Sequence, residues 1–263
     1  MPKSETEDAG VISRILSSFK VDLCVSDEQL VENVKSALGR RLPLAGNFRP
    51  HKRIMSIAGG GPSLDDTYKD LRGEICAING SLAYLLERNV NPWACGLLDP
   101  RPHISEFVIK GTRTIYFVAS ICDPCVFNKL AGEIVVLWHP GGMAGMSEIL
   151  PEGTNMIGGG CTMGLRWLNL GYNMGFREIH CHGFDSSFRK DKTHAYTDER
   201  DKILEGLELH GYRTAMNFIE QIDDWFKTKS MFQSLPRKHR PRIILHGDGL
   251  LQYCDKSPVR RVA

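Results

Sequence analysis

From residue 53 onward, short apolar runs alternate with segments whose apolar positions recur at helical spacing. The runs have no polar face, so they predict strands that are buried on both sides. The segments between them predict amphipathic helices that cover those strands. Together they indicate an α/β fold, with a mainly parallel sheet and helices on both faces. The predicted strands are 54–58, 75–78, 93–98, 114–119, 133–138, 178–182 and 242–246, and the predicted helices are 64–71, 81–89, 122–130, 162–175 and 208–227.

The first 50 residues predict a peripheral extension. Residues 27–42, DEQLVENVKSALGRRL, have the spacing of a short helix, with Asp27 as its cap and Gly39 at its end. Residues 43–52, PLAGNFRPHK, predict a linker. We therefore expect a helical extension and linker over 1–50 and one α/β domain over 51–263. In the helix near the other end of the chain, a wide apolar stripe favours packing on the sheet.

Composition narrows the class of protein. The chain has 263 residues, 42% of them hydrophobic and 24% charged, which is ordinary for a globular domain. A net charge of +2 argues against a strongly electrostatic nucleic-acid or membrane binder, although the last residues, SPVRRVA, form a small basic tail. Because no apolar run reaches membrane-spanning length and the polar start MPKSETEDAG is unlike a signal peptide, we expect a cytoplasmic protein. Most of the eight cysteines lie in apolar stretches and predict buried thiols, not a disulfide framework.

A glycine turn follows the first predicted strand. Ligands of open parallel sheets bind at the carboxyl ends of the strands, so this turn is a candidate binding loop. Its free amides would face a phosphate or a ribose, and its serine would cap the next helix. Asp65 and Asp66 weaken the attraction of that helix for an anion. A tight turn without any ligand is the alternative. The candidate nucleotide-binding residues here are Gly59, Gly60, Gly61, Pro62 and Ser63.

A second glycine triplet opens the helix predicted over 162–175. No acidic residue occupies the first turn of this helix, and Arg166 lies just beyond it, so it is electrostatically the better anion site. Close packing of the helix on the sheet is the alternative use of the glycines. The candidate nucleotide-binding residues are Gly158, Gly159, Gly160, Cys161 and Thr162, with Thr162 as the helix cap.

Four polar residues follow other predicted strands or lie in the loop beyond them. Asn79 and Asp99 follow the second and third strands, where they are suited to a base, a ribose or a metal, or serve as turn residues. Asp185 follows the strand at 178–182 and is suited to a ribose, a metal or an acceptor. His194, in a loop with basic neighbours, is suited to general acid or base chemistry, or is a solvated side chain.

Two other chemistries fit the sequence less well. Cys122 and Cys125 form a single CxxC pair, which has no second pair to complete a zinc site and lies in a chain with too many elements for a thioredoxin fold. His180 and His182 point to one side of a strand, but two histidines are too few for a closed zinc site without distant partners. We therefore assign no metal ligands, and there is no G-x-S-x-G elbow of a serine hydrolase.

Several of these motifs occur in the order that a known family shows. GGGPSL at 59–64, Asn79, Asp99-Pro100 and the stretch GGGCTMGLRWLNLGYNMGFREIHCHGFDSSF at 158–188 resemble the motility accessory factors and 6-hydroxymethylpterin diphosphokinase-like proteins. More distantly they are similar to bacterial sialyltransferases that open with G-N-G-P-S-L. The likeness covers residues 53–200. It implies a Rossmann-like fold that binds a nucleotide at both glycine turns, with His194 as the base.

The resemblance implies two branches of transferase chemistry. In the sialyltransferases a CMP-sugar is the donor and no metal is needed, but Gly60 here replaces the middle asparagine and removes one side-chain contact to the nucleotide. In the diphosphokinases ATP and magnesium transfer a diphosphate to a pterin alcohol, and Asp99 and Asp185 are the carboxylates that could serve the metal. We expect a transferase with a small-molecule nucleotide donor and a hydroxyl acceptor, first a glycosyltransferase with a CMP-type nucleotide sugar, with His194 and Asp185 catalytic. A diphosphokinase-like enzyme and a non-catalytic nucleotide-binding protein are the alternatives.

Overall fold

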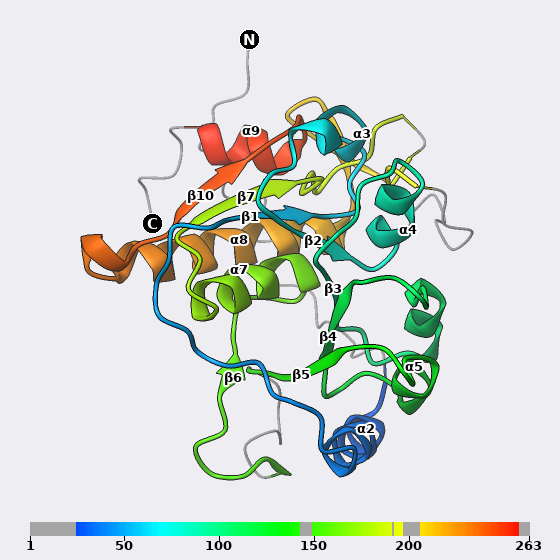
Figure 1. Ribbon diagram of the computed structural model, residues 1–263. Coiled ribbons are helices and arrows are strands. Elements are labelled where there is room, and N and C mark those ends of the chain that lie inside the picture. The colour runs from blue at the N-terminus through cyan, green and yellow to red at the C-terminus, as the bar shows by residue number, and fades with distance from the viewer. Residues whose placement is uncertain (1–24, 143–148, 191, 197–205, 258–263) are drawn as a thin grey trace.

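The computed structural model describes residues 25–142, 149–190, 192–196 and 206–257. Its centre is a sheet of eight parallel strands in the order β10-β7-β1-β2-β3-β4-β5-β6 (Figure 1). This arrangement confirms the predicted α/β, Rossmann-like class with helices on both faces. The strands are β1 (Ile54–Ala58), β2 (Glu74–Ile78), β3 (Ala94–Leu97), β4 (Ile115–Ala119), β5 (Val135–Pro140), β6 (Met156–Ile157), β7 (Glu178–His182) and β10 (Arg242–Leu245).

The seven predicted strands are all present, since each apolar run supplies the side chains that both helical layers cover. In β1 every residue except Ile54 is buried, and all four residues of β3 are buried. The two residues of β6 were not predicted, because a strand this short has no readable alternation. Three tryptophans, Trp138, Trp167 and Trp225, are among the largest fully buried side chains of the core.

The helices form two layers. α3 (Leu64–Thr67), α4 (Ser81–Leu86), α5 (Pro124–Lys129) and α9 (Leu250–Lys256) lie on one side of the sheet, and α7 (Met163–Asn173) and α8 (Met216–Ser234) on the other (Figure 1). Short 3₁₀ turns follow α3 at Tyr68–Asp70, precede β4 at Pro102–Phe107 and precede β10 at Arg237–His239. No helix among the described residues is long and apolar enough to cross a membrane.

The prediction of helix from residue 208 is wrong for its first turns. Residues Leu207–Leu209 (β8) and Tyr212–Thr214 (β9) form an antiparallel hairpin, and the helix begins only at Met216. His210 and Gly211 turn the chain with φ angles of 52° and 80°, a left-handed pair that no helix accommodates. The apolar stripe does pack inward beyond that point, with Ile219, Trp225 and Phe232 buried.

The N-terminal helix forms as predicted, as α2 (Asp27–Gly39). Ser26, not Asp27, is its cap, because the Ser26 hydroxyl accepts from the Gln29 amide. Buried Asn33 donates to the carbonyl of Ile121 at 2.9 Å, which ties α2 to the loop after β4. The following linker runs beside β5, where the Ala45 amide donates to the Leu137 carbonyl. The division of the chain at residue 50 stays a prediction.

The strand order reverses direction beside β1. From β1 the chain proceeds through β2 to β6 in one direction, whereas β7 pairs with the opposite side of β1. The connections after β1 and β7 therefore leave the sheet toward opposite faces, and the gap between them is a topological switch point, where open α/β sheets bind ligands. The first predicted glycine turn and Asp185 lie on the two sides of this gap.

Candidate functional site

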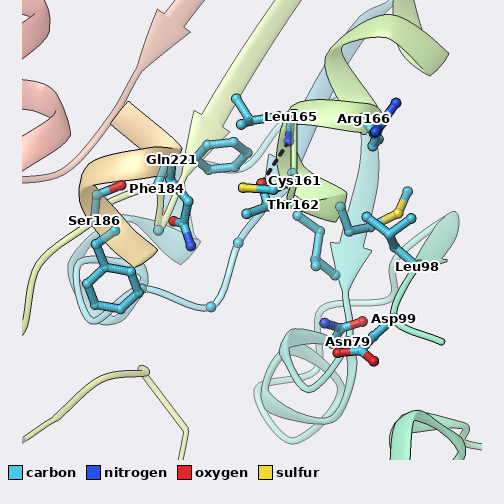
Figure 2. Close-up of a pocket in the computed structure, with 18 of the residues that line it drawn as sticks. Asn79, Leu98, Asp99, Cys161, Thr162, Leu165, Arg166, Phe184, Ser186 and Gln221 are labelled. Carbon is cyan, nitrogen blue, oxygen red and sulfur yellow. Dashed lines mark hydrogen bonds between the residues drawn. The ribbon is translucent and has the colours of Figure 1, made fainter. Parts of the chain in front are cut away.

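A pocket of about 550 Å³ opens at this switch point. It is bounded by the loops after β1, β2, β3 and β7, by the first turn of α7 and by α8 (Figure 2). Nine of the predicted site residues line it: Gly59, Gly60, Gly61, Asn79, Asp99, Cys161, Thr162, Asp185 and His194. Pro62, Ser63, Gly158, Gly159 and Gly160 do not line it. The two glycine turns thus meet at one pocket, the first directly and the second through Cys161 and Thr162.

The first glycine turn is closely packed against other loops. A Cβ on Gly59 would lie 2.5 Å from the Gly183 carbonyl oxygen, and one on Gly61 would lie 2.8 Å from Asp185 Oδ2. A Cβ on Gly60 would lie 2.7 Å from Cδ2 of His194. Packing among these loops therefore requires all three glycines, as the tight-turn alternative proposed. It also leaves this wall of the pocket as bare backbone.

Asp185 holds the turn in place from across the switch point. Its Oδ2 accepts from the Ser63 amide at 2.6 Å, and its Oδ1 accepts from the Ser63 hydroxyl. Because Ser63 is turned toward Asp185, it does not cap α3 as expected. Burial raises the pKa of Asp185, although the hydrogen bonds from Ser63 and the charge of Arg189 oppose the shift. The contacts of this carboxylate are those of a positioning residue, and a catalytic role for it stays a prediction.

The second glycine turn is shaped by packing as well. Thr162 caps α7 as predicted, with its hydroxyl accepting from the Leu165 amide at 3.4 Å (Figure 2). Gly159 and Gly160 have φ angles of 111° and 83°, and a Cβ on Gly160 would lie 2.7 Å from Leu165. These glycines therefore serve the turn into α7, and only the residues after them reach the pocket.

An acidic residue from another helix stands at the start of α7. The first turn of α7 itself has no acidic residue, as predicted, but Asp224 on α8 accepts from the Cys161 amide at 2.9 Å and brings a carboxylate to it. Burial, together with the charge of Asp224, raises the pKa of Cys161 to about 12. Asp224 lies 63 residues away in the sequence, beyond the reach of any local pattern. Met163 and Gly164 line the pocket, and their amides have no hydrogen-bond acceptor in the described part of the chain.

Arg166 does not face the pocket as a free cation. Its Nη1 donates to the carbonyls of Gly141, at 2.9 Å, and Ile157. Burial lowers its pKa, and the charge of Asp224 opposes that shift. Arg166 therefore joins α7 to the loops after β5 and β6, a structural use of a side chain that the sequence suggested for anion binding.

Asn79 and Asp99 stand at the end of the pocket formed by β2 and β3 (Figure 2). Asn79 has a φ of 49°, and its buried Oδ1 has no hydrogen-bond partner among the described residues. Asp99 instead pairs with Arg101, whose Nη2 lies 2.5 Å from Oδ2 and whose amide donates at 2.9 Å to Oδ1. Burial raises the pKa of Asp99, but the Arg101 hydrogen bonds and charge outweigh it and lower the pKa overall. Asn79 therefore offers an unused acceptor to a ligand, whereas the Asp99 carboxylate is engaged.

His194 lies over the first glycine turn. The adjacent Ala195 amide donates to the Gly60 carbonyl at 2.9 Å, which holds the segment 192–196 against the turn. His194 Nδ1 lies 3.1 Å from the Thr193 hydroxyl, and the ring stacks on Tyr196 with centroids 4.9 Å apart. An imidazole oriented in this way beside the pocket is suited to proton transfer.

Known proteins share this architecture. The model of the family described as "6-hydroxymethylpterin diphosphokinase MptE-like" matches residues 28–191, more than half of the chain. The chain belongs to the MptE-like family. No curated protein matches it. Among solved structures it resembles that of the MAf glycosyltransferase from Magnetospirillum magneticum AMB-1, with a TM-score of 0.66 and 14% sequence identity. The match covers 95% of this chain and 43% of that one, and at this identity it shows a shared fold.

The MptE-like match covers most, but not all, of the residues that line the pocket. Both glycine turns, Asn79, Asp99 and Asp185 fall inside it, and it begins within α2, earlier than the resemblance expected from residue 53. His194 and the pocket residues Phe218 and Gln221 lie beyond its end. Sequence reasoning missed Phe184, Tyr196 and Gln221, which come to the pocket through tertiary packing. Of these, only Phe184 had a signal, since it lies two residues beyond the end of β7.

The CxxC pair lies outside this pocket's chemistry. None of the seven described cysteines forms a disulfide. Cys24 and most of the basic tail lie outside the described residues. Burial raises the pKa of Cys122 and of Cys125, where nearby Asp123 adds to the effect. A redox thiol needs a lowered pKa. The raised pKa values therefore favour the sequence interpretation that redox chemistry fits this pair less well.

Proposed function

We propose that this protein is a nucleotide-dependent transferase that moves a group from an activated nucleotide to a hydroxyl acceptor. The family is named for a diphosphokinase and the structural neighbour is a glycosyltransferase, and both of these are transferases. The first candidate donor is a nucleotide sugar of the CMP type. The observation that carries the proposal is the convergence of both glycine turns on one pocket of about 550 Å³ at the switch point, a size typical of small-molecule sites.

Each part of the pocket suits a different part of a nucleotide. The amides of Met163 and Gly164 open α7 and are suited to the phosphate, because backbone N–H groups at a helix start attract anions. The bare backbone of the Gly59–Gly61 turn allows the ribose and base to lie close. The buried Asn79 Oδ1 would gain a donor from the base or the ribose, which removes the cost of an unpaired acceptor.

His194 provides the proton transfer in this proposal. The acceptor hydroxyl binds beside the imidazole, which takes its proton as the oxygen attacks the transferred group. The contact between Thr193 and Nδ1 fixes the ring orientation. General base catalysis of this kind contributes a factor of about 10² to 10⁴ in rate. The remaining rate enhancement comes from holding donor and acceptor together and from amides aimed at the leaving phosphate.

A diphosphokinase reaction is the second candidate, and the family match favours it. Asp99 and Asp185, the two carboxylates that line the described pocket, are engaged by Arg101 and Ser63. As placed, they do not fit a magnesium site, so magnesium would enter this reaction as the Mg·ATP substrate. Both carboxylates are therefore already paired. We place glycosyl transfer first because it needs no metal in the similar sialyltransferases.

A thermal-shift screen separates the candidates. The protein is melted with CMP, CDP, UDP and ATP, each with and without magnesium. A ligand at 100 times its Kd stabilises the folded state by about 2.7 kcal/mol. We expect a metal-free shift with CMP for glycosyl transfer, whereas a shift with ATP that needs magnesium supports the diphosphokinase. If no nucleotide raises the melting temperature, the proposal is wrong in both forms.

The His194→Ala variant then tests for catalysis. With a donor and an acceptor that show turnover, kcat should fall by about 10² to 10⁴ while the nucleotide shift is retained. The matched control is His239→Ala, an exposed histidine in the turn before β10. Nucleotide binding with no transfer to any acceptor, in wild type and variant alike, would indicate the non-catalytic alternative.

A further inference from the structure

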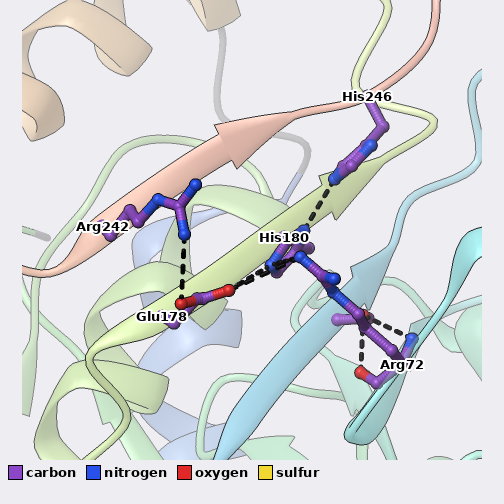
Figure 3. Close-up of polar contacts among 6 residues, drawn as sticks. Arg72, Glu178, His180, Arg242 and His246 are labelled. Carbon is purple, nitrogen blue, oxygen red and sulfur yellow. Dashed lines mark hydrogen bonds and ion pairs between the residues drawn. The ribbon is translucent and has the colours of Figure 1, made fainter.

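Three histidines meet on the α3 and α9 side of the sheet, apart from the pocket lining. His180 and His182 lie on β7, and His246 directly follows β10. One nitrogen from each lies within 4.8 Å of the others. His180 Nδ1 is 2.7 Å from His246 Nε2 (Figure 3). Because β10 pairs in parallel with β7, His246 lies beside the two histidines of β7 and adds the third histidine that the β7 sequence alone does not provide.

His182 supplies an independent sign of a missing ligand. It has no solvent exposure, and neither of its ring nitrogens has a hydrogen-bond partner among the described residues. The backbone of Thr67 approaches the ring but does not form a hydrogen bond of good geometry. Buried polar atoms are paired in most proteins, and an orphan imidazole is costly. Its ring stacks on that of His246, with centroids 4.2 Å apart.

Polar side chains lie behind the cluster. On the far side of His180, Nε2 lies 3.0 Å from Glu178 Oε1 and 2.8 Å from Arg72 Nη2 (Figure 3). A carboxylate behind a histidine is the usual support for a metal-bound imidazole. Metal binding through Nδ1 places the His180 proton on Nε2, where Glu178 accepts it and the contact with Arg72, which can only donate, gives way.

We propose that His180, His182 and His246 bind one divalent transition-metal ion of the zinc class. Three imidazole ligands suit zinc, which takes nitrogen ligands at about 2.0–2.1 Å. Tetrahedral bonds of that length set the nitrogens about 3.3 Å apart. Binding therefore replaces the contact between His180 and His246 and turns the stacked rings of His182 and His246 toward a common centre. A fourth position is left for water or another small ligand.

The proposed metal site is connected to the nucleotide pocket through a chain of hydrogen bonds. Gln252 on α9 donates to the His246 carbonyl at 2.9 Å and lies 3.4 Å from Asp185 Oδ1. Asp185 in turn holds Ser63 and the first glycine turn. A metal that fixes His246 would therefore fix the segment that carries this chain of contacts, which is a structural role distinct from the transfer reaction.

The test is metal binding by the intact chain. Protein stripped with a chelator is titrated with Co²⁺ and Zn²⁺, followed by visible absorption, and dialysed zinc is counted by atomic emission. We expect one equivalent per chain and cobalt d–d bands without the thiolate charge-transfer band that cysteine ligands produce. Less than one equivalent, or a thiolate band, would overturn the proposal.

Two variants separate the site from adventitious binding. His182→Ala removes the orphan ring, and His246→Gln changes a partly exposed ring with less risk to folding. Each should lose the equivalent of metal, while His239→Ala keeps it and circular dichroism shows that all three are folded. Unchanged stoichiometry in both cluster variants would contradict the proposal. The readout is independent of nucleotide binding, so either proposal can fail without the other.

Discussion

At the scale of single residues, Gly60 shows how packing and proposed function share one position. The turn has no side chain there because the ring of His194 and the hydroxyl of Tyr196 occupy that space, and a Cβ at this position would lie 2.9 Å from Tyr196 Oη. Because Gly60 has no side chain, its backbone lines the pocket directly. A side chain at Gly60 would thus disturb both the wall of the pocket and the histidine proposed as the base.

We predict that Gly60→Ala weakens nucleotide binding and slows transfer. A methyl group 2.7 Å from the His194 ring and 2.9 Å from the Tyr196 hydroxyl displaces these side chains of the 192–196 segment, which misplaces the base. The measurement is nucleotide affinity by calorimetry, together with kcat. The control is Gly39→Ala, where an added Cβ meets nothing within 4 Å. Equal affinity and rate in Gly60→Ala and wild type would show that the segment has no part in the site.

At the scale of elements, the start of α7 is the part of the site on which charge acts most directly. Thr162 accepts from one amide of the first turn, and two residues with unpaired amides, Met163 and Gly164, line the pocket. Asp224 stands against Cys161 and places a negative charge where a phosphate is proposed to bind. Like charges at a helix N-terminus weaken anion binding by about 0.3–1 kcal/mol.

We therefore predict that Asp224→Asn tightens nucleotide binding about two- to fivefold, which is that energy expressed as affinity. Asparagine keeps an oxygen for the Cys161 amide and removes only the charge. Asp223→Asn is the matched control, because Asp223 carries the same charge on the adjacent residue and lies closer to their shared partner Lys227, at 2.5 Å against 3.7 Å for Asp224. Calorimetry at low and high salt measures both variants. Weaker binding in Asp224→Asn would argue against a phosphate at α7.

Helices and strands could be predicted from the sequence where their buried side chains recur at the spacing of the element. The strand runs and α2, α4, α5 and α7 follow directly from apolar spacing. The β8–β9 hairpin does not, because Tyr212 and Ala215 also fit a helical stripe and only the left-handed His210-Gly211 pair breaks it. Of the site, residues that directly follow strands could be found, since the strand-end rule is local. Asp224 and Gln221 could not, because their helix is brought to the pocket by tertiary packing.

At the scale of the whole molecule, the parallel sheet buries polar groups as well as apolar ones. His139, at the end of β5, is 3% exposed, and its Nδ1 has no partner among the described residues. Burial lowers its pKa. Below the ordinary imidazole value of about 6.5, the unfolded chain therefore holds a proton that folded His139 does not, and protonation favours the unfolded state.

The free energy of unfolding should therefore fall as pH drops from 7 toward 5, with a contribution from His139 of at most about 1.4 kcal/mol per pH unit. His139→Gln removes this contribution and should flatten the slope. Urea unfolding of wild type and variant between pH 5 and 7 measures how the free energy of unfolding depends on pH. At pH 8 imidazole is neutral in the folded and the unfolded state, so the difference between the two proteins there gives the packing cost of the substitution. Parallel slopes in the two proteins would rule out His139 as a source of acid sensitivity.

The central claim is that the two glycine turns form the walls of one nucleotide site at the switch point between β1 and β7. A crystal structure with the nucleotide that gives the largest thermal shift tests it most directly. We predict that the nucleoside lies against Gly59–Gly61 with a donor on the Asn79 Oδ1, and that its phosphate accepts from the amides of Met163 and Gly164. A nucleotide bound elsewhere on the molecule, with this pocket holding only solvent, would contradict the account.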